Sequence, residues 1–282
     1  MYLNCHTYFS LRYGLYSPER LAQEAAQLGL HALALTDINN TSGIFPFVQA
    51  CREHRIQPIA GIEFRDAYSH FIGLAHNQAG FYELNAYLSH HTATAEPANY
   101  TAHAFEQVSV IYPLGRKYPA HLKANEYLGI RPREAAQLLN PRLRPYRHRC
   151  VVLQPVTVAG PFEHQVHQIL RAVDENTTIA KVNRSALSHK GDMLQPYDQL
   201  LKAFELTPEV VQNTERLIGQ CRDDYDLTGD KNRQCFTKSY KDDQQLLEKL
   251  AYEGFPKRYA ADDQAAFRRL ERELAVINKL GF

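Results

Sequence analysis

The amino-acid sequence predicts an α/β protein in which parallel strands form a barrel or an open sheet, followed by a helical C-terminal segment. Two observations lead to this prediction. Short apolar strands alternate with amphipathic helices in the first part of the chain, and from about Phe162 onward the strand signal fades while helical periodicity continues. The 282 residues suffice for one large domain or two smaller ones. We expect a barrel over residues 1–200 and helices over 201–282.

The first elements are a strand, a helix and a second strand. Leu3 leads a short strand, and Ser17-Pro18-Glu19 then provides an N-cap, a proline in the first turn and an acidic residue that favour a helix start. Gly29 is placed to end this helix, and HALALTD, from His31 to Asp37, follows as an apolar strand. A helical crossover between two neighbouring strands predicts that they are parallel.

The same alternation continues along the chain. Further strands are expected over 58–63, 70–75, 108–112, 127–130 and 150–153, and helices over 44–51, 81–89 and 131–139. The later helices are marked by three apolar stripes, which are Val210, Val211 and Leu217, then Leu246, Leu247 and Leu250, and last Leu270, Leu274 and Ile277. This number of alternating elements fits a barrel as readily as an open sheet.

Composition excludes several classes of protein. No apolar run approaches the ~20 residues that span a bilayer, so we expect a cytoplasmic protein with no membrane partner. Five cysteines without a CxxC spacing indicate buried thiols rather than a disulfide framework or a zinc ribbon. The net charge of +1 excludes polyanion binding by overall charge alone.

One segment is nevertheless strongly basic. Residues 113–149 hold nine lysines and arginines against two glutamates. Arg142, Arg144 and Arg147 within it are candidates for contact with nucleic-acid phosphates. A solvated surface segment explains the same charges, because no aromatic or glycine pattern of a known nucleic-acid-binding module accompanies them.

Side chains capable of metal binding fall at the ends of several expected strands. His6, Asp37, Glu63 and His70 would meet at one mouth of a barrel, where chemistry collects in such folds. Carboxylates and imidazoles together bind Zn²⁺, Mn²⁺ or a metal pair, which would activate water for phosphoester hydrolysis. Each residue also has a structural interpretation: His6 as a satisfied core histidine, and Asp37 as the cap of the next helix.

The order of these residues resembles a known family. The stretches CHTYFSLRYGLYSPERLAQEAAQLGLHALALTDINNTSGIFPFVQACREHRIQPIAGIEF and HFIGLAHNQAGFYELNAYLS are similar to the polymerase and histidinol phosphatase (PHP) domain that begins bacterial replicative DNA polymerases of the polymerase III alpha type. The C-terminal stretch from Leu247 to Phe282 resembles the helices that lead from that domain to the polymerase palm. The resemblance is weakest between about Leu88 and Phe162 and implies a distorted parallel β/α barrel with a helical extension.

Compared with the family's ligand motifs, this chain keeps only some ligands. Asn4, His6 and Tyr13 stand where the resemblance places two histidines and an aspartate, and Ile38 replaces the histidine of a Thr-Asp-His motif. Asp37, Glu63 and His70 are retained, whereas Tyr112-Pro113-Leu114 and Gln154 to Val158 offer no ligand where the family has one. The resemblance therefore implies a degenerate site with no catalytic residue and no tightly bound metal, in which His6, Glu63 and His70 could hold one residual Zn²⁺ or Mn²⁺.

The resemblance also implies a function for the longer protein. Such a polymerase extends a primer with Mg²⁺, through carboxylates that would lie beyond Phe282. This chain would then be a scaffold for the remainder of the polymerase, which itself contacts DNA, and a docking surface for a proofreading exonuclease subunit.

The alternative is an active metal-dependent phosphoesterase or 3′–5′ exonuclease. It would gain support if His76, His90, His91 or His103 supplied the missing ligands. His164 and His167, three apart on an expected helix, are interpreted as an exposed pair.

Overall fold

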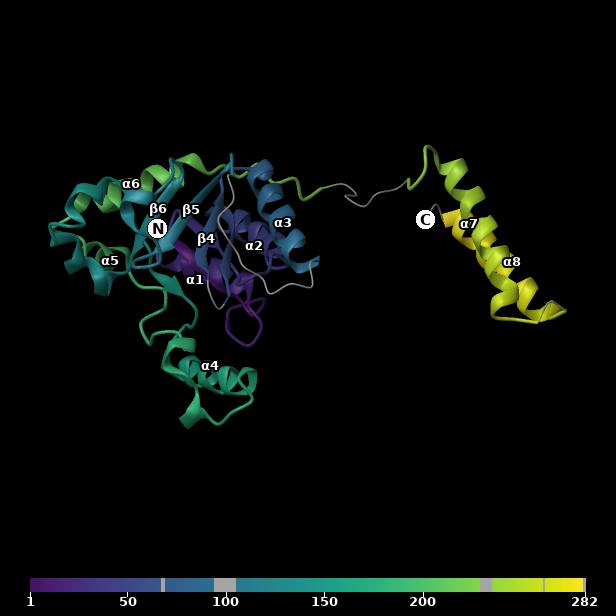
Figure 1. Cartoon of the computed structure of the whole chain (residues 1–282), viewed down its shortest axis with the longest axis horizontal. Helices are drawn as coiled ribbons and strands as arrows, with labels where there is room; N and C mark the ends of the chain where they lie inside the picture. Colours follow the sequence, from purple (N-terminus) through teal and green to yellow (C-terminus); the bar gives the residue numbers. More distant parts are fainter. Residues whose placement is uncertain (67–68, 94–104, 229–234, 261, 281–282) are drawn as a thin grey trace. The chain divides into compact units, whose positions relative to one another are not determined.

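The computed structural model describes residues 1–66, 69–93, 105–228, 235–260 and 262–280. The chain divides into two compact units, Met1–Leu227 and Thr228–Phe282. The first unit contains the sheet and the second a pair of helices (Figure 1). Within the described ranges, no helix combines the length and the hydropathy needed to cross a bilayer.

In the described part of the first unit, one mixed sheet of eight strands organises the fold. Its spatial order is β7-β6-β5-β4-β3-β2-β1-β8, and it curls into a half-barrel. The strands are β1 (Tyr2–Cys5), β2 (Ala32–Leu35), β3 (Gln57–Arg65), β4 (His70–Ala75), β5 (Val108–Pro113), β6 (Glu126–Ile130), β7 (Cys150–Val152) and β8 (Pro155–Val156). The barrel-type α/β fold predicted from the sequence is confirmed.

Strand β4 departs from the parallel pattern. It pairs antiparallel with both β3 and β5, whereas the other neighbouring strands are parallel. Only the four positions from 66 to 69 connect β3 to β4. A parallel pair needs a crossover of a dozen or more residues, so such a short connection allows only an antiparallel hairpin.

Helices connect and cover the strands of the first unit. The Ser17 side chain accepts a hydrogen bond from the Arg20 backbone N–H at 3.1 Å, which caps the first helix as its sequence predicts. The helices are α1 (Pro18–Gln27), α2 (Ile44–Glu53), α3 (Gln78–Ala93), α4 (Pro161–Asp174), α5 (Tyr197–Lys202) and α6 (Pro208–Gln220). Short 3-10 helices are η1 (Pro119–His121), η2 (Pro132–Leu139), η3 (Arg144–Arg149), η4 (Ile179–Lys181) and η5 (Arg184–Ala186). The helix expected over 131–139 is therefore present, but as 3-10 turns.

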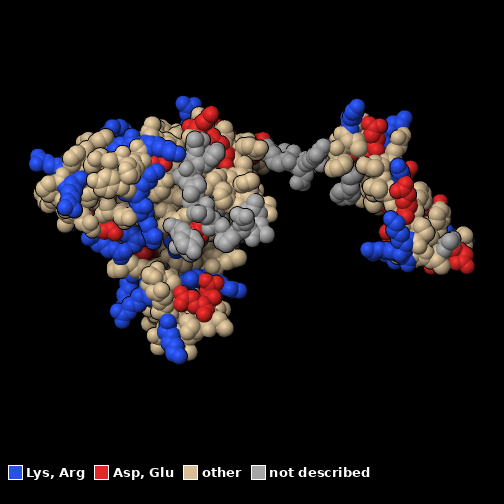
Figure 2. Space-filling model, in the orientation of Figure 1, with Lys and Arg blue, Asp and Glu red and all other residues tan. Residues whose placement is uncertain are grey.

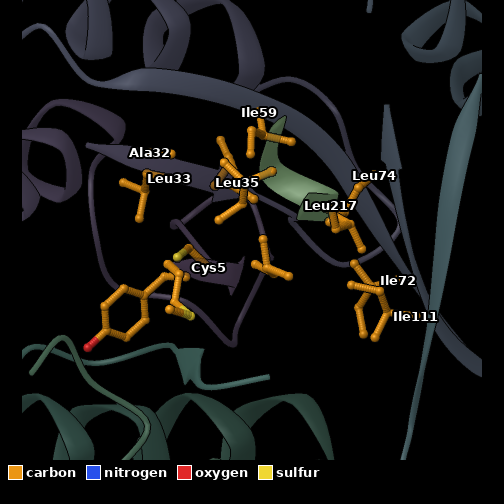
Figure 3. Packing of buried hydrophobic residues seen from close by; sticks show 14 of the residues in the cluster. Cys5, Ala32, Leu33, Leu35, Ile59, Ile72, Leu74, Ile111 and Leu217 are labelled. Carbon is orange, nitrogen blue, oxygen red and sulfur yellow. The ribbon is translucent and has the colours of Figure 1, made fainter. Parts of the chain in front are cut away.

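The core lies between the sheet and its helices. Leu35, Ile59, Ile72 and Ile111 converge from four strands, and Leu217 reaches the same cluster from α6 (Figure 3). All five side chains are at most 1% exposed. Burying one such side chain contributes about 1.5–3 kcal/mol, so this cluster fixes the strand ends from which the polar residues extend.

Three adjacent parallel strands bring the predicted site residues to one edge of the sheet. Cys5 in β1 pairs with Leu35 in β2, which in turn pairs with Ala60 in β3. The chain therefore leaves β1 at His6 and β2 at Asp37, close to where β3 approaches Glu63.

The second unit is a helical hairpin. It consists of α7 (Tyr240–Gly254), the 3-10 helix η6 (Phe255–Lys257) and α8 (Gln264–Leu280). The ring centroid of Phe255 lies 5.2 Å from that of Tyr259 and 5.5 Å from that of Phe267. Among the described residues of this unit, Phe255 and Leu274 are the buried hydrophobic side chains, so its packing is sparse.

Candidate functional site

Glu63 is the centre of the candidate site. Its side chain is fully buried near the end of β3. Oε2 accepts a hydrogen bond from His6 Nε2 at 2.8 Å, and Oε1 accepts one from Arg65 Nε at 2.6 Å and is also contacted by Arg65 Nη2. His70 Nε2 lies 2.9 Å from Oε1 without the alignment of a hydrogen bond. Burial opposes ionisation, but the charges of Arg65, His70 and His6 outweigh it and hold the pKa of Glu63 well below its ordinary value.

His6 uses both ring nitrogens within the protein. Nδ1 pairs with the Thr157 hydroxyl at 2.9 Å, while Nε2 faces Glu63. Because an ionised carboxylate can only accept a hydrogen bond, Nε2 must carry a proton in this arrangement. His6 therefore ties β1 to β3 and to the segment after β8.

Asp37 does not join this group but organises the turn that follows β1. Its carboxylate accepts three hydrogen bonds of 2.6 Å, from the Thr7 backbone N–H, the Thr7 hydroxyl and the Ser10 hydroxyl. Burial raises the pKa of this carboxyl, against the effect of these hydrogen bonds. With its oxygens engaged in this way, Asp37 supports the loop that carries Tyr13.

The three residues at replaced ligand positions are integrated into the packing. Asn4 Oδ1 accepts a hydrogen bond from the Thr36 hydroxyl at 2.8 Å. The Tyr13 ring is contacted by the Arg65 guanidinium, 4.7 Å from the ring centroid, and lies 5.3 Å edge-on from His6. The Ile38 backbone bridges to Glu63, which places its apolar side chain at the mouth of the barrel.

The histidine pair on α4 is buried, so the expectation of an exposed pair is wrong. His164 is 6% exposed and His167 is fully buried. His167 Nδ1 bonds to the Tyr13 carbonyl at 2.7 Å, and Nε2 accepts the Ser188 N–H at 2.9 Å. Both histidines face inward because α4 packs against the Tyr13 loop and the Ser188 segment.

Arg65 and Arg171 are site residues that the sequence reading missed. Arg171 extends from α4 to within 5.8 Å of the Tyr13 ring centroid and bonds to Asp174 at 2.7 Å. Both arginines line a cavity of about 410 Å³ that is also bordered by Tyr13 and Ile38. Of the two arginines, only Arg65 had a signal in the sequence. It lies two residues after Glu63 on the same strand, so the two side chains are on the same face of the sheet.

The residues present do not fit a divalent metal. A metal-binding imidazole must offer a lone pair, yet His6 Nε2 carries a proton toward Glu63. Glu63 already has a guanidinium as its counter-ion, and of the histidines that the structure describes only His70 keeps a buried ring nitrogen without an aligned hydrogen bond. Among the described residues, no cluster of three or more His, Cys, Asp or Glu side chains has a metal-binding arrangement.

The middle-segment histidines that the structure describes add no ligand set to this site. His76 Nε2 pairs with the Ser109 hydroxyl at 2.8 Å, and burial lowers the His76 pKa. His91 Nδ1 bonds to the Tyr87 carbonyl at 2.8 Å. His90, on α3, belongs to no metal-binding cluster of the described residues, and His103 lies outside those residues.

The basic segment is partly used for internal structure. Arg147 Nε donates to the Leu138 carbonyl at 2.8 Å, and its Nη1 lies 3.4 Å from Glu209. Arg142 and Arg144 are exposed and form no side-chain ion pair within the described ranges. Figure 2 shows Lys and Arg side chains gathered on the side of the first unit where α5 and α6 lie.

Comparison with known proteins finds a family model that matches part of the chain and relatives that match all of it. Residues 3–128 match the model of the PHP domain. All of the chain aligns with the error-prone DNA polymerase of Symbiobacterium thermophilum at 26% identity, and with the DNA polymerase III subunit alpha of Bacillus subtilis at 23% identity. It covers 30% and 28% of these relatives, so it spans less than a third of their length.

Solved structures show a weaker likeness. A two-domain protein from Bacteroides vulgatus containing a predicted PHP-like metal-dependent phosphoesterase aligns with a TM-score of 0.29 and 16% identity, over 78% of this chain and 62% of that one.

Residues 3–128 therefore match the PHP domain, and the whole chain is similar to part of the alpha subunit of bacterial DNA polymerase III and of error-prone DNA polymerase.

Proposed function

We propose that this chain is a non-catalytic PHP domain of a bacterial replicative or error-prone DNA polymerase, acting as a scaffold and as a docking surface for a proofreading exonuclease subunit. The observation that carries the proposal is the barrel mouth, where the buried carboxylate of Glu63 is neutralised by Arg65 rather than left open to a metal. The match of the whole chain to part of two polymerases supports the polymerase context. In that context, Mg²⁺ and the DNA primer belong to the remainder of the polymerase.

The expected lack of phosphoester hydrolysis rests on how His6, Glu63 and Asp37 are bonded. A phosphoesterase of this kind needs metals that fix and activate water, which requires several deprotonated donors around an open position. Here His6 and Glu63 bond to each other, and Asp37 bonds to Thr7 and Ser10.

The cytoplasm is the expected compartment, as for other replication proteins.

The test combines hydrolysis with binding. The purified chain is expected to show no turnover of a generic phosphoester or of single-stranded DNA with added Mn²⁺ or Zn²⁺. It is expected to form a one-to-one complex with the exonuclease subunit of the same organism in analytical ultracentrifugation. Turnover that disappears in both His6→Ala and Glu63→Ala would instead establish the alternative, an active metal-dependent phosphoesterase or exonuclease.

A second candidate function, contact with DNA, is favoured by the exposure of Arg142 and Arg144. Changing both to alanine should weaken duplex binding and reduce the slope of log K against log salt by about 2, since each lost phosphate contact removes about 0.9. Fluorescence anisotropy over a salt series measures both quantities. Lys190→Ala combined with Arg222→Ala is the matched control, because both residues are exposed and lie outside the basic segment. An equal loss in this control would show that only overall charge matters.

A further inference from the structure

We propose that Arg65 is a built-in cation that takes the place of a divalent metal at the barrel mouth, so that the site is complete without a metal and excludes one while Arg65 is present. This inference rests on the proposed non-catalytic function, because both require that the site works without a metal. It goes further by naming the side chain that replaces the ion.

The first step of the argument is charge. A fully buried carboxylate needs a compensating cation or several hydrogen bonds, since an unpaired buried charge is strongly destabilising. Residues 63 and 65 of β3 point to the same side of the sheet, and the Arg65 guanidinium contacts Glu63 Oε1 through both Nε and Nη2. Arginine remains charged at any working pH, so this compensation is permanent.

The second step is that Arg65 is held in position. Its backbone N–H donates to Asn39 Oδ1 at 3.0 Å, and Asn39 Nδ2 donates to the Arg65 carbonyl at 2.7 Å. Asn39 has φ of 48°, in the left-handed region that asparagine tolerates better than most residues. The guanidinium also lies over the Tyr13 ring, a cation–π contact. The cation is thus fixed at both the backbone and the head group.

The third step is competition for the carboxylate. A metal bound to Glu63 Oε1 would share that buried oxygen with a guanidinium, and two cations at one oxygen repel each other. His70 Nε2, 2.9 Å from the same oxygen, is the remaining nitrogen that a metal could use. Removing the Arg65 charge therefore frees the Glu63 oxygen beside a ring nitrogen that already has no hydrogen bond.

The decisive comparison is between Arg65→Met and Arg65→Lys in the 282-residue chain. Methionine keeps much of the side-chain volume but removes the charge, whereas lysine retains it. Calorimetric titration with Zn²⁺ should show one new site in Arg65→Met that is absent from the wild type and from Arg65→Lys, with at least tenfold weaker binding after the further change His70→Gln. Saturating Zn²⁺ should raise the Tm of Arg65→Met by about 4 °C or more.

A second comparison, between a double variant and the same variant with Arg65→Met added, is needed if Arg65→Met alone binds Zn²⁺ weakly or folds poorly. Asn4→His with Ile38→His adds two imidazoles, one on the His6 face of β1 and one at the backbone bridge to Glu63. This double variant should still bind no Zn²⁺ at the site while Arg65 is present and should bind it when Arg65→Met is added. Circular dichroism establishes that each variant is folded.

Two results would overturn the proposal. One is a Zn²⁺ or Mn²⁺ ion bound by the wild-type chain and lost in Glu63→Gln. The other is Zn²⁺ binding by the double histidine variant that does not change when Arg65 is replaced by methionine. Neither result depends on the exonuclease complex, and metal binding without turnover would leave the proposed docking function intact.

Discussion

Replacing Glu63 with alanine is expected to lower the free energy of unfolding of the first unit by about 3–5 kcal/mol. The change leaves the Arg65 guanidinium, whose side chain is 29% exposed, and the protonated nitrogen of the buried His6 with no carboxylate between them. Urea denaturation followed by far-UV circular dichroism measures the loss, since the chain has no tryptophan. Glu53→Ala, at an exposed position of α2, should change stability by less than about 0.5 kcal/mol.

A double-mutant cycle identifies the source of this loss. If the cost arises from stranded positive charge, Glu63→Ala combined with Arg65→Met should be less destabilised than the sum of the two single changes. Additive effects would mean that Glu63 acts mainly through packing and through its bond to His6. Unchanged stability in Glu63→Ala would show that the buried carboxylate is dispensable, which contradicts the ion-pair account.

Much of the fold follows from sequence periodicity, but contacts between distant segments do not. The Ser17 cap, the apolar stripe of α1 and the strand 32–35 predict the first strand–helix–strand unit, and parallel topology then places His6 beside Glu63. The antiparallel direction of β4 is implied by its short connection to β3, a signal that the apolar pattern alone does not carry.

The site was less predictable, because its partners come from far along the chain. Thr157, which pairs with His6, is 151 residues away from it. Asp37 could be read as a ligand or a cap, and only the fold of residues 7–10 shows that it supports a turn. Arg65 could have been found from its spacing to Glu63, but charged residues near strand ends are usually solvated, so spacing alone does not select it.

Because His167 is buried, the free energy of unfolding of the first unit is expected to fall in mild acid. Nε2 accepts the Ser188 N–H, so the ring is neutral, and a proton on that nitrogen would break the bond. Burial lowers the pKa of His167 from its ordinary value of 6.5 to about 4, and the charges of His164, Arg171 and His6 act in the same direction. The hydrogen bond to the Tyr13 carbonyl opposes this shift only in part.

The direction of the pH effect follows from where the proton binds. Between pH 6.5 and 4 the unfolded chain holds a proton on this histidine that the folded chain does not, so the free energy of unfolding must fall as the pH falls. The full shift corresponds to about 3 kcal/mol, at 1.36 kcal/mol per pKa unit. Glu63, whose pKa is lowered, adds a further loss below its ordinary value of 4.5, and Asp37, whose pKa is raised, acts in the opposite direction.

Comparison of wild type with His167→Gln isolates this histidine from the two carboxylates, because both chains share Glu63 and Asp37. Glutamine can still donate and accept hydrogen bonds but does not titrate, so the variant should be less stable at pH 7 and should lose less stability between pH 6.5 and 4.5. Urea midpoints at half-unit pH steps give the difference between the two curves. Parallel curves would mean that His167 is protonated equally in the folded and unfolded chains, which its bond from Ser188 does not permit.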